Sequence, residues 1–124
     1  MRVVIPAVLV VTFASPAYPD EAAAWAGMGT TSCTAYAQAY KQDPVRLEDL
    51  YFVWAQGFMS GLNTRHVPSH EETDLLSKTF PSQAQERFIQ RYCDQHPLVD
   101  YVDAVLALWR EMRRSQGLPF VGLP

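Results

Sequence analysis

Cys93 and Ser60 are the two side chains that we considered as nucleophiles. His96 lies three residues after Cys93, and an adjacent imidazolium would lower the pKa of the Cys93 thiol. A disulfide at Cys93 would remove this chemistry. Ser60 lies in the segment G-F-M-S-G, but the nucleophile elbow of hydrolases needs a glycine two residues away on each side of the serine, at a strand-to-helix turn. Because neither condition is met, we interpret Ser60 as a small residue at a helix contact and expect no catalytic residue.

The potential metal ligands are densest in one short segment, which contains His66, His70, Glu71, Glu72 and Asp74. Imidazole and carboxylate are reasonable ligands for a divalent ion. However, Pro68 and the capping residue Ser69 separate the two histidines, which therefore do not share a helical face as in the H-E-x-x-H motif. We interpret the segment as the solvated, acidic first turn of a helix. With no dinucleotide, haem or zinc motif either, the sequence predicts no metal site, no cofactor and no enzyme.

The N-terminus indicates where the protein works. Arg2 precedes an apolar run from Val3 to Phe13, and small residues follow, which is the layout of a secretory signal peptide. The run is about half of the ~20 residues that a membrane-spanning helix needs. We therefore predict a leader over residues 1–17 and a periplasmic or secreted protein with no membrane contact after cleavage.

Charge and cysteine content narrow the partners further. Loss of Arg2 from 10 basic and 13 acidic residues leaves a net charge of about −4, so the sequence predicts no nucleic-acid surface. Cys33 and Cys93 are the two cysteines, and in an exported protein they predict one disulfide. Closing a loop of about 60 residues stabilises a fold by roughly 4 kcal/mol in the chain-entropy model.

Helical periodicity and capping residues divide the chain after the leader. We interpret residues 18–31 as a weakly ordered segment, 32–115 as a helical domain and 116–124 as a C-terminal tail. Two serines with capping-box spacing, at positions 69 and 82, mark two of the helix starts. The expected helices cover about 32–43, 47–63, 69–79, 82–95 and 98–114. The sequence thus predicts an all-α single domain, a small bundle of four to five helices closed by one disulfide.

The second expected helix contains two glycines four residues apart, Gly57 and Gly61. Each costs roughly 1 kcal/mol relative to alanine in a helix interior. Charged residues in the helix exclude a membrane seam, and a phosphate loop would need a preceding strand. We therefore predict a helix-contact notch on the buried face, formed by Trp54, Gly57, Ser60 and Gly61 and filled by Tyr92 or Trp109.

The order of these landmarks resembles small exported bacterial proteins of uncharacterised function. The shared motifs are W-x-x-G-[FY]-x-S-G-x-N, here W-A-Q-G-F-M-S-G-L-N, and Y-C-x-x-x-P, here Y-C-D-Q-H-P, and the match covers roughly residues 32 to 114. More distantly, the chain resembles the periplasmic acid-stress chaperones HdeA and HdeB and the helical immunity proteins of type VI secretion. The resemblance implies that Cys33 and Cys93 form the family disulfide and that Trp54 and Gly57 belong to its central helix.

Two functions follow from the resemblance, and both need a protein partner. The first is a stress-response chaperone whose partner is a misfolded client. The second is an immunity protein that inhibits one secreted effector. A chaperone needs apolar surface that a trigger releases, whereas an inhibitor needs a fixed patch that fits a single partner. The sequence leaves the oligomeric state open.

Overall fold

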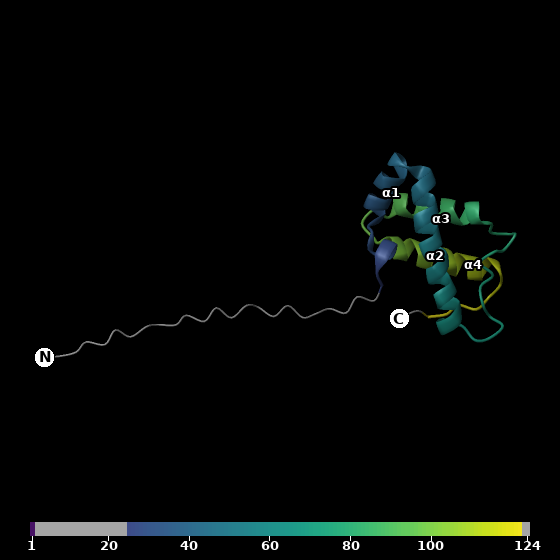
Figure 1. The fold of residues 1–124 in the computed structure, drawn as a ribbon. Helices are drawn as coiled ribbons and strands as arrows, with labels where there is room; N and C mark the ends of the chain where they lie inside the picture. Colours follow the sequence, from purple (N-terminus) through teal and green to yellow (C-terminus); the bar gives the residue numbers. More distant parts are fainter. Residues whose placement is uncertain (2–24, 123–124) are drawn as a thin grey trace.

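The computed structural model of the protein describes Met1 and residues 25–122 and has an all-helical fold (Figure 1). A short 3-10 helix is followed by four α-helices: η1 (Gly27–Thr30), α1 (Cys33–Gln42), α2 (Pro44–His66), α3 (Ser82–Gln95) and α4 (Tyr101–Ser115). Within the described residues no strand forms, and Ser32 and Asp100 share an isolated bridge. The predicted all-α bundle is therefore confirmed. Apart from Met1, the predicted leader lies outside the described residues.

Helix α2 is the longest element and crosses in front of α3 and α4, which lie one above the other behind it (Figure 1). Helix α1 contacts both α2 and α3. The corner between α1 and α2 depends on Asp43, whose backbone N–H donates to Ala39 O at the end of α1. The Asp43 carboxylate then accepts from Arg46 N and caps α2, with Pro44 in the first turn. One residue thus ends one helix and begins the next.

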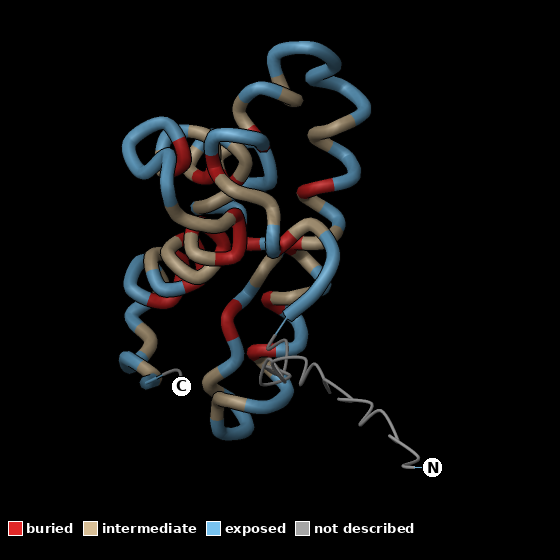
Figure 2. The backbone as a smooth tube through the Cα atoms, turned by 90° about the vertical axis from the view of Figure 1, so that its left-hand side faces the viewer, coloured by how far each residue is buried: buried red, intermediate tan, exposed pale blue. Residues whose placement is uncertain are grey.

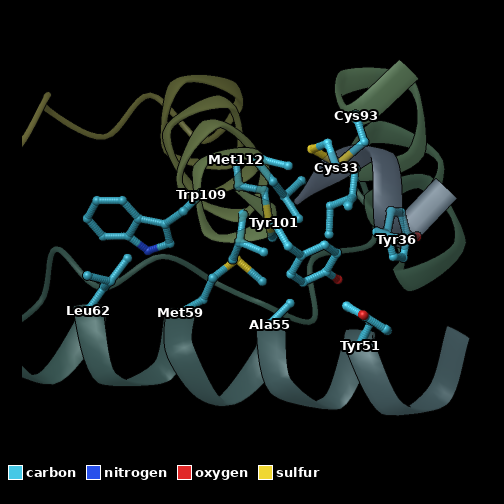
Figure 3. Close-up of a cluster of buried hydrophobic side chains, with 14 residues drawn as sticks. Cys33, Tyr36, Tyr51, Ala55, Met59, Leu62, Cys93, Tyr101, Trp109 and Met112 are labelled. Carbon is cyan, nitrogen blue, oxygen red and sulfur yellow. A yellow bond between two sulfur atoms is a disulfide. The ribbon is translucent and has the colours of Figure 1, made fainter. Parts of the chain in front are cut away.

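The core lies between α2 and the helices behind it. Figure 3 shows the inner face of α2 lined by Tyr51, Ala55, Met59 and Leu62, opposite side chains of α4 that include the fully buried Trp109. The buried parts of the backbone accordingly lie on the inward sides of the helices (Figure 2). Because these residues recur every three or four positions, α2 presents one apolar side to the core.

Three tyrosines meet where α1, α2 and α4 come together (Figure 3). The ring centroids of Tyr36, Tyr51 and Tyr101 lie 4.8 to 4.9 Å apart at steep interplanar angles, an arrangement that aromatic quadrupoles favour. The Tyr51 hydroxyl donates to Thr31 Oγ1 at 3.2 Å. Burial raises the pKa of Tyr36 and Tyr101 well above the ordinary value for a phenol. The cluster therefore holds three helices together without introducing charge into the core.

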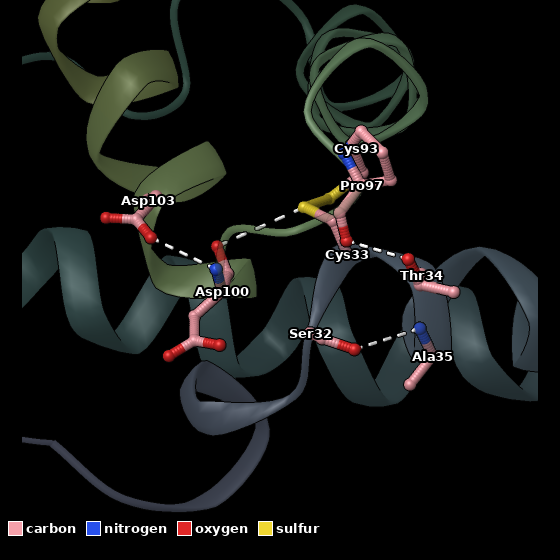
Figure 4. Close-up of a disulfide and its surroundings, with 8 residues drawn as sticks. All are labelled: Ser32, Cys33, Thr34, Ala35, Cys93, Pro97, Asp100 and Asp103. Carbon is pink, nitrogen blue, oxygen red and sulfur yellow. Dashed lines mark hydrogen bonds between the residues drawn. A yellow bond between two sulfur atoms is a disulfide. The ribbon is translucent and has the colours of Figure 1, made fainter.

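The predicted disulfide joins Cys33 at the start of α1 to Cys93 in the last turn of α3 (Figure 4). The same corner is fixed by main-chain hydrogen bonds, since Cys33 N donates to Val99 O at 2.8 Å and Tyr101 N donates to Thr31 O at 2.8 Å. The start of α1 is thus bound to the loop between α3 and α4. A structural disulfide of this kind indicates an oxidising environment outside the cytoplasm.

The helix expected over residues 69–79 is absent, and the structure has turns there. Side chains of the neighbouring helices bind the loop backbone instead. The Asn63 amide donates to Thr73 O and accepts from Thr73 N, and the buried Gln85 amide donates to Leu75 O and Phe80 O. Because these backbone N–H and C=O groups already have hydrogen-bond partners, they do not need the hydrogen bonds of a helix. The capping-box spacing at Ser69 was therefore misleading.

The last helix begins at Tyr101 and not near Leu98, because Asp100 is its N-cap. Asp100 N donates to Asp103 Oδ2 at 3.1 Å, as in a capping box, and Asp103 N donates to Asp100 O at 3.0 Å (Figure 4). At the other end, Gly117 has φ +70° and Leu118 N donates to Arg113 O at 2.9 Å. This is a Schellman motif, whose positive φ favours glycine. It turns the C-terminal tail back onto α4.

The buried guanidinium of Arg113 holds that tail and the 67–81 loop together. Its donors bind Pro119 O in the tail, and Glu71 O and Thr73 Oγ1 in the loop. The group also lies over the Trp109 ring, 5.0 Å from the centroid. Burial lowers the pKa of Arg113 from its ordinary value, but neutral acceptors satisfy most of its donors. The part of the predicted tail that is described is therefore bound to the domain.

Candidate protein-binding surface

The predicted notch at Gly57 and Gly61 is wrong. Both glycines are exposed, and a Cβ atom added to either would have no neighbour within 4 Å. The two side chains proposed to fill the notch lie elsewhere. Trp109 is buried in the core and donates to Asn63 Oδ1, whereas Tyr92 stacks on Phe88. The stripe inferred from the sequence belongs to the outward side of α2.

A large side chain does pack closely against a glycine, but the side chain belongs to α2 and the glycine to η1. Trp54 lies against η1, where its indole Nε1 donates to Ala26 O at 3.1 Å. A Cβ atom on Gly29 would lie 2.3 Å from Cη2 of Trp54. A Cβ atom on Gly27, which has φ +73°, would lie 3.3 Å from Nε1 of the same ring. Residues 25–31 of the segment expected to be weakly ordered are therefore structured, and the small residues beneath Trp54 are those of η1.

The residues considered for chemistry are not assembled into a site. Ser60 is exposed, and its hydroxyl donates to Gln56 O in its own helix. Cys93 is in the disulfide, and the His96 ring lies 4.4 Å from that of Tyr92. Within residues 25–122, no three His, Cys, Asp or Glu side chains are grouped to hold a metal ion, and no helix is long and apolar enough to span a membrane.

The outward side of α2 has a composition that is unusual for a solvent-exposed helix. Residues 50–64 contain no charged side chain. The exposed side of this stretch, which we call the α2 outer face, consists of Leu50, Val53, Gly57, Ser60, Gly61 and Thr64. Val53 is 70% exposed. Ser60 and Thr64 donate their hydroxyl hydrogens to carbonyls of α2, so this face could be covered without leaving these donors unpaired.

A groove adjoins the α2 outer face. It has a volume of about 410 Å³ and is lined by Trp25, Ala26, Val53, Trp54, Gly57 and Phe58. We call it the Trp25 groove. Its floor is formed by Trp54 and Phe58, which stack with ring centroids 5.1 Å apart, and the Trp54 indole N–H donates to Ala26 O. Concave sites lined by aromatic and aliphatic side chains are typical of binding sites.

The sequence contained a signal for this surface that the periodicity argument missed. A helix with a solvated side normally carries charged residues along it, and the uncharged stretch from residue 50 to 64 departs from that pattern. Of the residues predicted to form the notch, the Trp25 groove contains Trp54 and Gly57, and the α2 outer face contains Gly57, Ser60 and Gly61. Leu50 and Val53 were not identified as site residues.

A carboxylate pair lies between α2 and α3, outside this surface. Glu86 is half-buried beside Glu48. Burial, followed by the hydrogen bond and the negative charge of Glu48, raises the pKa of Glu86 to about 7. Asp49 adds to this effect and Arg87 opposes it. The folded protein therefore binds a proton at Glu86 in a range where an unfolded carboxylate has lost it.

This pair predicts that the fold becomes more stable as the pH is lowered from 8 to about 5.5. A carboxyl pKa that is raised on folding adds stability at low pH, which is lost as the pH rises through about 7. We expect Glu86→Gln to remove this gain and to stabilise the protein at pH 8 by about 1 kcal/mol, a value reduced for partial exposure. Urea unfolding across this range measures both effects, with Glu72→Gln, an exposed carboxylate elsewhere, as the control. Parallel pH profiles for wild type and Glu86→Gln would contradict the assignment.

The chain was also compared with known proteins. No protein family model, no curated protein and no solved structure matches it.

Proposed function

We propose that this protein is exported to the periplasm or secreted, has no enzymatic activity, and binds another protein through the Trp25 groove and the α2 outer face. The observation that carries the proposal is the uncharged stretch of residues 50–64, whose outward side is exposed on the folded domain. An exposed helix face that carries Leu50 and Val53 and no charge is unusual on a solvated helix, and exposed apolar side chains grouped on one face commonly mark a binding site. The predicted leader and the disulfide support a location outside the cytoplasm.

Of the two functions considered, inhibition of a single partner has the better support. The groove and the α2 outer face are exposed in the folded, disulfide-closed domain, so binding needs no trigger to release them. A chaperone activated by acid would have to open its core at low pH. The Glu48 and Glu86 pair opposes such opening, since protonation of Glu86 favours the folded state. The acid-stress chaperone is therefore the alternative.

The test uses wild type, Trp25→Glu and Val45→Glu as immobilised baits for the secreted and periplasmic proteins of the source organism at pH 7. Val45 is 74% exposed and lies on α2 outside both surfaces. We expect one protein to be captured stoichiometrically by wild type and Val45→Glu, and at least about ten-fold more weakly by Trp25→Glu, because buried tryptophans dominate interfaces. Equal capture by all three baits would contradict the proposed site.

A second measurement distinguishes the inhibitor from the acid-stress chaperone. An aggregation-prone client is incubated with the protein at pH 2 to 3 and then neutralised. Protection of the client at near-stoichiometric amounts, together with no specific capture at pH 7, would replace the inhibitor by the chaperone.

A further inference from the structure

Five residues of α2 form one continuous row along its outward side. Asp49, Val53, Gly57, Gly61 and Arg65 are spaced four apart in the sequence, and residues with this spacing form a ridge on a helix surface. All five are exposed. Within the described residues, neither Asp49 nor Arg65 forms an ion pair.

The row is complementary to itself when a second copy is placed antiparallel. A two-fold axis midway between the two Gly57 residues pairs position 49 with 65 and position 53 with 61. Asp49 of one copy then faces the partner's Arg65, and the Val53 side chain faces the empty space above the partner's Gly61. Gly57 faces its own equivalent, where neither copy has a Cβ atom. Opposite charges thus face each other at both ends of the row. Between them, the Val53 side chain of each copy lies against the partner's Gly61, which has no side chain.

The geometry of helix packing is compatible with this pairing. Rows of residues spaced by four are inclined by about 26° to the helix axis, so two such rows become parallel when the helices cross at about 50°. Two glycines per helix at the crossing permit a close backbone approach. A Cβ atom at Gly57 or Gly61 would meet nothing within the monomer, so the space above them is free for a partner.

We propose that two copies of this protein form a two-fold dimer through the row Asp49, Val53, Gly57, Gly61 and Arg65 of α2. This inference rests on the proposed function, because it names a second copy as one protein that covers the α2 outer face.

Sedimentation equilibrium of the purified protein tests the dimer. We expect wild type to associate to twice the monomer mass. Gly61→Leu should remain folded, since the monomer has room for the side chain, but should weaken association at least ten-fold, because leucine occupies the space for Val53. Circular dichroism and a melting curve check that the fold is kept. Leu76→Glu, at an 82% exposed position in the 67–81 loop outside α2, is the control and should associate like wild type.

Charge exchange tests the pairing itself. Asp49→Arg alone and Arg65→Asp alone should each weaken association, because like charges then meet at both ends. The double variant Asp49→Arg with Arg65→Asp should recover it. A monomeric wild type, or a Gly61→Leu variant that associates like wild type, would overturn the dimer. Failure of the double variant to recover association would overturn the antiparallel pairing. Either result leaves the proposed function standing if Trp25→Glu still loses its captured partner.

Discussion

Replacing Gly29 by alanine is expected to lower the free energy of unfolding by about 3 kcal/mol, the upper range for overpacking a core position. The added Cβ atom would lie 2.3 Å from Cη2 and 2.4 Å from Cζ2 of Trp54. The ring cannot easily retreat, because it is hydrogen-bonded to Ala26 O and stacked on Phe58. Urea unfolding of the variant measures the loss.

The matched control is the same substitution at Gly61. A Cβ atom there meets nothing within 4 Å, and alanine is favoured over glycine in a helix interior by about 1 kcal/mol. We therefore expect Gly61→Ala to be more stable than wild type at protein concentrations where both are monomeric. Equal stability of Gly29→Ala and wild type would show that η1 does not pack beneath Trp54.

Removing the disulfide is expected to lower the free energy of unfolding by about 4 kcal/mol, because the bond closes a long loop in the unfolded chain. Cys33 and Cys93 are 60 residues apart in the sequence. For a domain of this size, that is a large share of a total stability of roughly 5–15 kcal/mol. Thermal unfolding with and without reductant, and of the double variant Cys33→Ala with Cys93→Ala, measures the loss.

The double variant also provides the control for this experiment. Reductant should not change its melting temperature, since it has no disulfide left to reduce. If reductant leaves the melting temperature of the wild-type protein unchanged as well, the disulfide does not contribute to stability as proposed.

The features that could be predicted from the sequence are those set by local chemistry. Ser32 caps α1 and Pro97 follows the end of α3, as their residue types indicate. The disulfide followed because two cysteines allow a single intramolecular pairing. By contrast, Ser82 lies inside the first turn of α3, whose N-cap is Pro81, and Gln85, three residues after Ser82, is buried and binds the loop.

The orientation of α2 could not be predicted, for a physical reason. In a sequence, the side of a helix that faces solvent is normally recognised by its charged residues. Residues 50–64 contain none, so the row through Trp54, Gly57 and Gly61 fitted the periodicity as well as the truly buried row through Ala55, Met59 and Leu62. The outward face of α2 has no charge. This explains why the notch was predicted on the wrong side of the helix, and it also makes this face a candidate binding surface.

The contacts around Gly29 and the 67–81 loop depend on residues far apart in the sequence. Trp54 reaches η1 across 28 positions, and Arg113 reaches Thr73 across 40. No local spacing encodes such partners. A glycine beneath a tryptophan and a loop held by the side chains of Asn63 and Gln85 become visible only when the helices are placed in space.

Both the proposed function and the proposed dimer require that another protein covers the outward face of α2. Photo-cross-linking measures this directly, with benzoylphenylalanine placed at position 53 in one variant and at position 76 in the other. Both positions are exposed, 70% and 82%, and position 76 lies in the 67–81 loop outside α2. Illumination at pH 7 should give a covalent adduct with a second copy or a captured protein from position 53 and little or none from position 76. Equal yields from the two positions, or no adduct from position 53, would contradict the claim.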